Sequence, residues 1–218
     1  MFIFKIINDV TIVTDNSFKT NITCEKAKFT IIGKSGEDFS YLPSIEKIDS
    51  IILSQYTLKE VVRQTIFSIA DNDNNKLMTG ELFEINGDTL KVVSLDGHRI
   101  SIRNIELKNS YPSRKVVVPG KTLNEISKIL SGDADKDVSI FFTGKHIVFE
   151  FDNTTVVSRL IEGEYFKIDQ MLSSDYETKV TINKKELLEC IDRATLLVKE
   201  GDKKPIIINI LDEVMELR

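Results

Sequence analysis

Three stretches of this chain begin in the same way, and their spacing constrains the fold more than any other feature. TLKEVVRQTIFSI begins at Thr57, TLNEISKIL at Thr122 and NKKELLECIDRATLLV at Asn183, so the starts lie 65 and 61 residues apart. Each first residue is a favourable helix N-cap, and a glutamate three positions later completes the pattern of a capping box. Each stretch also places apolar residues at helical spacing. The chain is therefore predicted to repeat one helix-containing unit.

Strand-like segments surround these predicted helices. The β-branched runs SIIL, KVVV and KVTI precede the three helices. After the first helix, GELFEI, TLKVVSL and HRISIRNIEL are separated by NGD and DG, which favour tight turns between antiparallel strands. After the second, VSIFF, HIVFEF and TTVVSRLI are separated by TGK and DN. The pattern predicts an α+β fold built from β-α-β-β-β units of about 60 to 65 residues.

The two ends of the chain show only parts of this unit. FIFKII, VTIVT, TNITC and AKFTII come first with no helix before them, and PIIINI and DEVMELR follow the third helix. We therefore expect both terminal units to be incomplete and the chain to be a piece of a longer one. Similar exits, AKFTIIGKSGEDFSYLP and VVSRLIEGEYFKIDQML, recur two units apart. Two β-α-β-β-β units are thus expected to form one domain.

Composition limits the classes of function. With 29 basic and 34 acidic residues the net charge is −5, so any contact with DNA must come from a local basic patch. Cys24 and Cys190 form neither a disulfide framework nor a metal-ligand spacing, which favours a reduced cytoplasmic protein without metal or cofactor. No apolar run approaches the roughly 20 residues that span a bilayer, so no membrane association is expected. MFIFKIINDV lacks the features of a signal peptide and is predicted to be a strand.

The stretch SLDGHRIS concentrates residues that can perform chemistry. Asp96, His98 and Arg99 together could indicate acid-base catalysis or phosphate binding. However, Asp96-Gly97 is predicted to be a turn, so His98 and Arg99 would begin the next strand on opposite faces and could not converge on one reacting atom. From these residues alone, a structural hairpin is favoured over a binding site, and a binding site over catalysis.

A tandem of such domains, with DGHR after the second strand of a middle domain and EGEYF at its exit, resembles the bacterial sliding clamps, the beta subunits of DNA polymerase III. The most specific segment is FSIADNDNNKLMTGELFEINGDTLKVVSLDGHR. The resemblance implies the DNA clamp fold, with helices lining the inside of a ring and antiparallel sheets outside. It also implies three domains: residues 1–46 as the C-terminal part of the first, 47–173 as the complete second, and 174–218 as the N-terminal part of the third.

The resemblance implies a processivity factor of the replicative polymerase without catalysis of its own. When full length, such a protein forms a head-to-tail homodimeric ring that encircles and slides on double-stranded DNA without sequence preference. A hydrophobic pocket tethers the replicative polymerase, the clamp loader and repair proteins through short peptides. A bacterial, cytoplasmic and nucleoid-associated location follows.

Carried over by position, the resemblance also implies three sets of site residues. Phe166 stands where the family more often has proline, and the loop at residues 70–78 is richer in asparagine than is usual. The partner-peptide pocket is expected to contain Met78, Leu95, Gly97, His98, Arg99, Ile100, Phe166, Gln170 and Met171. The expected DNA contacts are Arg63, Asn72, Lys76, Leu77, Lys121 and Lys184. The expected dimer interface contains Phe29, Leu196 and Leu197.

The sequence is compatible with two other functions. The middle domain could be a stand-alone module that binds peptides without any ring. Alternatively, the DGHR turn could serve a phosphoesterase-like enzyme, in which replacing His98 would abolish turnover rather than weaken partner binding.

Overall fold

The computed structural model describes residues 9–39, 47, 50–71, 74–172, 175–196 and 205–218. It divides into two compact units, residues 1–165 and 166–218. In chain order the strands are β1 Thr11–Thr14, β2 Lys19–Cys24, β3 Ala27–Ile32, β4 Ser50–Ser54, β5 Gly80–Leu95, β6 Ile100–Pro119, β7 Asp137–Phe142, β8 His146–Phe151, β9 Thr154–Arg159, β10 Ile208–Ile210 and β11 Met215–Leu217. The helices are α1 Gln55–Thr65, α2 Gly120–Ile129, α3 Ile168–Met171 and α4 Lys184–Thr195, and the 3-10 turns are η1 Gly36–Asp38, η2 Ile66–Ser68 and η3 Lys76–Thr79.

The first unit begins with a three-stranded antiparallel sheet in the order β1-β2-β3. These strands confirm the predictions made from VTIVT, TNITC and AKFTII. The predicted strand FIFKII lies outside the described residues. Every residue of β1 and β3 is exposed, including Phe29 and Ile32. The described residues of this small sheet therefore form no apolar core of their own.

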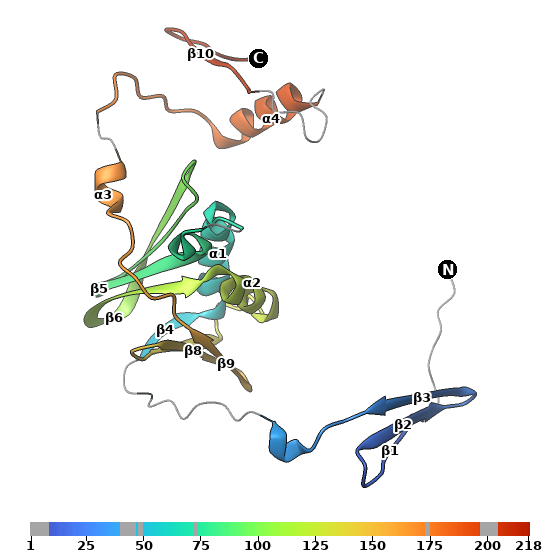
Figure 1. Cartoon of the computed structure of the whole chain (residues 1–218). Helices are drawn as coiled ribbons and strands as arrows, with labels where there is room; N and C mark the ends of the chain where they lie inside the picture. The colour runs from blue at the N-terminus through green and yellow to red at the C-terminus, as the bar shows by residue number, and fades with distance from the viewer. Residues whose placement is uncertain (1–8, 40–46, 48–49, 72–73, 173–174, 197–204) are drawn as a thin grey trace. The chain divides into compact units, whose positions relative to one another are not determined.

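The main body of the first unit combines two antiparallel sheets with two helices. One sheet has the order β4-β7-β8-β9, and the other is the long β5-β6 ribbon. Helices α1 and α2 contact each other and both strands of the ribbon (Figure 1). Their apolar faces and the inner faces of the strands form one core, which includes Ile51, Leu58, Phe83, Leu123 and Phe149. The predicted α+β class is confirmed.

The NGD segment reverses the chain as predicted, but it does so inside one continuous strand, β5. Glu81 before it and Ser94 after it both contact Thr65, which an unbent strand of this length could not allow. The register shifts there, because Gly87 pairs with Tyr111 whereas Thr89 pairs with Glu106. Gly87 has a φ of 62°, a left-handed conformation that suits the bend and the register shift at this point. The reversal predicted at NGD is therefore present, although the segments on either side of it form one strand, so that two long strands stand where three were predicted.

Two of the three predicted capping boxes were also wrong. Helix α1 begins at Gln55 because Ser54 is its N-cap, with Ser54 Oγ accepting from the Thr57 N–H at 3.1 Å. Pro119 precedes α2, and the Thr122 hydroxyl lies 2.8 Å from that of Ser158 instead. In α4, Asn183 caps the helix as predicted by accepting from two backbone N–H groups.

The glutamates of the first two predicted boxes form ion pairs along their own helices. Glu60 pairs with Arg63, and Glu125 pairs with Lys128. A side chain engaged with a residue three positions later does not reach back to the helix start.

Most of the remaining strand predictions are confirmed, and one is wrong. SIIL, VSIFF, HIVFEF and TTVVSRLI correspond to β4, β7, β8 and β9, and KVVV forms the end of β6. In the second unit, α4 and the β10-β11 pair lie where NKKELLECIDRATLLV, PIIINI and DEVMELR predicted them. KVTI before α4 is not a strand in the structure.

Gly80 marks a close approach between β5 and the segment that follows β9. A Cβ at this position would lie 2.7 Å from the Ile161 side chain and 2.7 Å from the Val118 carbonyl oxygen. The Ile161 N–H donates to the Val117 carbonyl at 2.9 Å, which holds the segment against β6. There is thus no space for a methyl group unless backbone moves.

Gly80→Ala is expected to lower the free energy of unfolding by about 1 to 3 kcal/mol, because the new methyl group would overpack this contact. Urea denaturation would measure the change. Gly144→Ala is the matched control, since nothing lies within 4 Å of a Cβ at Gly144. Equal stability of Gly80→Ala and wild type would contradict this account of the packing.

Candidate functional site

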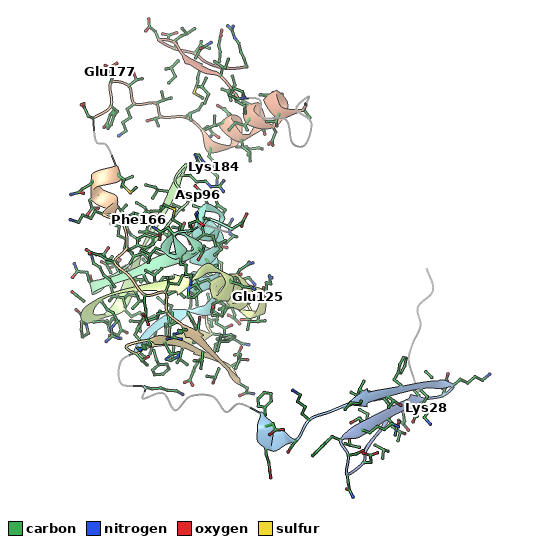
Figure 2. The ribbon with its side chains drawn as sticks, in the orientation of Figure 1. Lys28, Asp96, Glu125, Phe166, Glu177 and Lys184 are labelled. Carbon is green, nitrogen blue, oxygen red and sulfur yellow. The ribbon has the colours of Figure 1, made fainter. Side chains whose placement is uncertain are left out.

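The tip of the β5-β6 hairpin is the four-residue turn Asp96–Arg99, and Asp96 holds it closed. Its Oδ1 accepts from the backbone N–H groups of His98 at 3.0 Å and Arg99 at 3.2 Å, and its Oδ2 accepts from Arg99 Nε at 3.0 Å. These bonds, that from the His98 N–H first, hold the pKa of the Asp96 carboxyl below its usual value. Gly97 supplies the positive φ of 85°. The predicted turn is confirmed, and Figure 2 labels Asp96 within it.

His98 and Arg99 lie in the turn itself, because β6 begins at Ile100. The prediction that they begin the next strand on opposite faces was therefore wrong. Both side chains are exposed at the tip.

Two serines join this hairpin to the end of α1. Ser94 and Ser101 are directly paired across the ribbon. The Ser94 hydroxyl donates to the Thr65 carbonyl at 2.6 Å, and the Ser101 hydroxyl donates to the Gln64 carbonyl at 2.7 Å. Carbonyls in the last turn of a helix lack partners within the helix, so the two hydroxyls satisfy groups that would otherwise need water. We call this pair of hydrogen bonds the serine clasp.

The serine clasp places η2 beside the tip. Phe67 in η2 is 56% exposed, and the Arg99 guanidinium carbon lies 5.8 Å from the centre of its ring. This is within the range of a cation-π contact. Arg99 is thus held by the Asp96 carboxylate and by an aromatic face.

The loop before β5 folds back onto η2. The Ala70 N–H donates to the Met78 carbonyl at 2.8 Å, and the Met78 N–H donates to the Asn75 carbonyl at 3.0 Å. The Leu77 side chain covers Gly163, where a Cβ would lie 3.2 Å from the nearer Leu77 methyl carbon. Met78 and Leu77 are both half-buried as a result.

A buried carboxyl group, that of Glu81 on β5, contacts the end of α1. The residue is 0% exposed, and burial raises its pKa to about 8. Its Oε2 lies 3.0 Å from the Thr65 hydroxyl oxygen, which itself lies 2.8 Å from the Val61 carbonyl oxygen. A hydroxyl has one hydrogen and a carbonyl can only accept. Both contacts can be hydrogen bonds at the same time only if Glu81 is protonated. Glu81 then donates to the Thr65 hydroxyl, and the Thr65 hydroxyl donates to the Val61 carbonyl.

The surroundings of Glu81 agree with a neutral carboxyl. Within the described part of the chain, its Oε1 and the buried Ser68 hydroxyl have no hydrogen-bond partner. Among the described residues, the Tyr165 phenol interacts with it, and burial, together with Glu81, raises the pKa of that phenol. No cation of the residues that the structure describes is paired with Glu81, so an ionised carboxylate here would be a buried charge that they do not balance.

Comparison with known proteins decides the family. The family model for the central domain of the DNA polymerase III beta subunit matches residues 52–167. The chain belongs to the DNA polymerase III beta subunit family. Its match to the beta sliding clamp of Staphylococcus aureus strain Mu50 has 34% identity over 209 residues and covers 96% of this chain but 55% of that protein. The chain thus spans about half the length of the curated relatives it matches.

Solved structures of beta subunits show the same fold. A crystal structure of a DNA polymerase III beta subunit from Eubacterium rectale has 78% identity and a TM-score of 0.88, covering 96% of this chain and 57% of that one. The sliding clamp from Bacillus subtilis has 32% identity and a TM-score of 0.80, covering 95% and 58%. The expected DNA clamp fold is confirmed.

The structure brings together six of the residues that the family resemblance assigns to the peptide pocket. Leu95 is buried, Met78 and Ile100 are half-buried, and the turn residues are exposed. Phe166, Gln170 and Met171 belong to the second unit, where Phe166 is half-buried and the other two are exposed. The six in the first unit are Met78, Leu95, Gly97, His98, Arg99 and Ile100.

The side chains assigned to DNA contact differ in how far they are engaged. Arg63 donates to both carboxylate oxygens of Glu60, at 2.9 and 2.7 Å. Lys76 and Lys121 are exposed in the first unit, and Lys184 is exposed in the second. Asn72 lies outside the described residues. The described residues assigned to DNA contact therefore provide only a weakly basic surface.

The residues assigned to the dimer interface are exposed where the structure describes them. Phe29 on β3 is 64% exposed, and Leu196, just after α4, is 77% exposed. Leu197 lies outside the described residues.

Sequence reasoning missed Phe67, Glu81 and the serine clasp. Phe67 had a detectable signal, because it is an aromatic residue just past an amphipathic stripe. Glu81 follows a glycine at a strand start, where exposure is the usual expectation for a carboxylate. Neither serine carries a local signal, because each partner lies on α1.

The described residues indicate neither a metal centre nor a membrane span. No three of their His, Cys, Asp or Glu side chains gather closely enough to hold a metal ion. No described helix has the length and apolar character needed to cross a bilayer.

Glu81 is expected to make stability fall as pH rises. The folded state keeps a proton, with a pKa of about 8, that the unfolded chain releases near the ordinary value of 4.5. The stabilisation that comes from this bound proton is fully present below pH 4.5 and is lost as pH rises through about 8. Between these values the free energy of unfolding should fall with a slope approaching about 1.4 kcal/mol per pH unit. Urea denaturation from pH 5 to pH 9 would measure it.

Glu81→Gln should remove this slope, whereas Glu106→Gln, at an exposed site on the same ribbon, should retain it. A Glu81→Gln variant with the pH profile of wild type would show that Glu81 is already ionised in the folded state.

Proposed function

We propose that the chain acts as part of a DNA sliding clamp, a processivity factor of the replicative DNA polymerase. The single observation that supports this most strongly is the 34% identity to a curated beta sliding clamp along 96% of the chain. In the full-length protein, two subunits would join head to tail into a ring around double-stranded DNA. The ring would slide without sequence preference, because a closed ring cannot leave the duplex sideways.

The proposed domain division places residues 1–46 in the first clamp domain, 47–173 in the second and 174–218 in the third. The family match at residues 52–167 supports a central domain in the middle. Phe29, Leu196 and Leu197 would then contribute to the contact between the first domain of one subunit and the third domain of the other.

The DNA contacts would be few and weak. The Arg63 guanidinium is already paired with Glu60, and the net charge of −5 opposes strong binding to phosphates. Lys76 and Lys121 from the first unit and Lys184 from the second would supply long-range attraction, with Asn72 and Leu77 closer to the backbone of the duplex. Such binding is sensitive to salt because it depends on counterion release.

The peptide site would form around the hairpin tip. Met78, Leu95 and Ile100 would offer an apolar surface for the anchor side chains of a partner peptide. Arg99 and Gln170 would hold its polar groups, with His98 and the backbone of Gly97 bordering the pocket. Phe166, Gln170 and Met171 complete the proposed set. The replicative polymerase, the clamp loader and repair proteins would compete for this site.

No catalytic step is proposed. Asp96 is fully engaged in holding the turn, and Arg99 is paired with it, so neither is poised to act on a substrate. The comparisons favour neither the phosphoesterase-like enzyme nor the stand-alone peptide module. We also propose a bacterial cytoplasmic, nucleoid-associated location, in keeping with this function.

His98→Ala is expected to weaken binding of a fluorescently labelled clamp-binding peptide of the replicative polymerase about tenfold, within the range of interface residues whose truncation costs more than about 1 kcal/mol. Fluorescence anisotropy would measure the dissociation constant. His146→Ala is the matched control, because His146 lies on β8 away from the turn. Equal affinities of wild type and His98→Ala would contradict the proposed role of the turn, and hydrolysis of a phosphoester lost in His98→Ala would favour the enzyme instead.

Charge reversal at Lys76 and Lys121 is expected to weaken low-salt binding to duplex DNA and to reduce the salt slope by about one for each phosphate that is no longer neutralised. Titration of a labelled duplex at several salt concentrations would measure both effects. Lys108→Glu, at an exposed position of β6, is the control. If Lys108→Glu weakened binding as much, attraction would be due to total charge rather than to this surface.

A further inference from the structure

Phe67 is an exposed aromatic residue on a rigid piece of backbone. Its ring is 56% exposed, although its neighbours Ile66 and Ser68 pack inward. The serine clasp fixes the two residues immediately before η2, and the Ala70 N–H is bonded to the Met78 carbonyl just after it. An exposed ring on a backbone held from both sides costs little further ordering when a ligand binds it.

The ring lies where it can orient Arg99. The guanidinium carbon is 5.8 Å from the ring centre, and Arg99 Nε is bonded to Asp96 at 3.0 Å. One side of the guanidinium is thereby engaged, and its remaining N–H groups are donors with a defined plane. Arginine recognises carbonyl and carboxylate oxygens best when this plane is fixed.

Phe67 also adjoins the apolar part of the proposed site. Ala70 lies three residues after Phe67, and its hydrogen bond to Met78 brings Met78 back toward the end of η2. Exposed Phe67 and half-buried Met78 therefore lie on either side of this hydrogen bond. Both are close to the turn that carries His98 and Arg99. An apolar surface beside a fixed cation suits an extended peptide segment that presents an apolar side chain next to an acceptor oxygen.

We propose that Phe67 is a further residue of the partner-peptide site. Its ring positions the Arg99 guanidinium and packs against an apolar side chain of the bound peptide. This inference rests on the proposed peptide-binding function and adds to it a residue from the connection between α1 and β5.

The test compares three replacements of Phe67 with a matched control. Phe67→Leu keeps an apolar side chain but removes the ring, Phe67→Ala removes both, and Phe67→Tyr retains an aromatic face. Tyr56→Leu is the control, because Tyr56 is an exposed aromatic residue at the other end of α1. The probe is the labelled clamp-binding peptide of the replicative polymerase, measured by fluorescence anisotropy, with thermal unfolding recorded for each variant.

Phe67→Leu should weaken binding about two- to fivefold, the scale of an exposed cation-π contact, and Phe67→Ala should weaken it further. Phe67→Tyr and Tyr56→Leu should bind like wild type. In a double-mutant cycle with Arg99→Gln, the effect of Phe67→Leu should disappear, because the ring then has no guanidinium to position. A merely structural role for Phe67 would make the two effects additive.

A readout without peptide separates the two proposals. In wild type, the ring current of Phe67 should shift the NMR signals of the Arg99 side chain, and Phe67→Leu should remove that shift. Failure of wild type to bind the peptide would overturn the proposed function and the peptide contact together. Normal binding by wild type, Phe67→Leu and Phe67→Ala alike would overturn this inference alone, as would an Arg99 signal unaffected by Phe67→Leu.

Discussion

The hydrogen bonds from Ser94 and Ser101 to the last carbonyls of α1 are the contact on which the candidate site depends. A two-stranded ribbon is weakly stable alone, and its tip would move independently of the helix without such a connection. The two hydroxyls are directly opposite each other across the ribbon, so they hold both strands at once. They also bond consecutive carbonyls, Gln64 and Thr65, which fixes the direction of the chain as it leaves the helix. The positions of Phe67 and of the returning Met78 follow from that direction.

The same helix end contacts the buried carboxyl group of Glu81. Thr65 offers its carbonyl to Ser94 and its hydroxyl to the contact with Glu81. A neutral carboxyl can take part in this arrangement as a donor, whereas a carboxylate would compete for the hydrogen that Thr65 gives to Val61. With its proton bound, Glu81 would link β5 to α1, while the serine clasp links the ribbon to α1 near its tip.

Local patterns predicted the elements better than they predicted their connections. The apolar stripes located α1, α2 and α4, and the Asp96-Gly97 pair located the tip, because both signals depend on residues close in sequence. The Asn86-Gly87 pair carried a similar turn signal, and the chain does bend back there, but pairing with β6 continues through the bend and keeps β5 one strand. Thr57 and Thr122 looked like helix caps, but Ser54 stood three residues earlier and Ser158 lay on a distant strand. The exposed site residues could be proposed from family resemblance, whereas Phe67 and Glu81 gain their roles from contacts that only the folded chain creates.

The hairpin tip also has a kinetic consequence. Pairing Leu95 with Ile100 closes a very short loop, whereas pairing Ser50 with Phe141 in the other sheet joins residues far apart in the chain. Because the entropy lost in closing a loop grows with its length, the ribbon can begin to form at the turn and extend toward Gly80 and Pro119. The turn that we assign to partner binding would then be an early-forming part of the domain. Selection on its sequence would act on the rate of folding as well as on recognition.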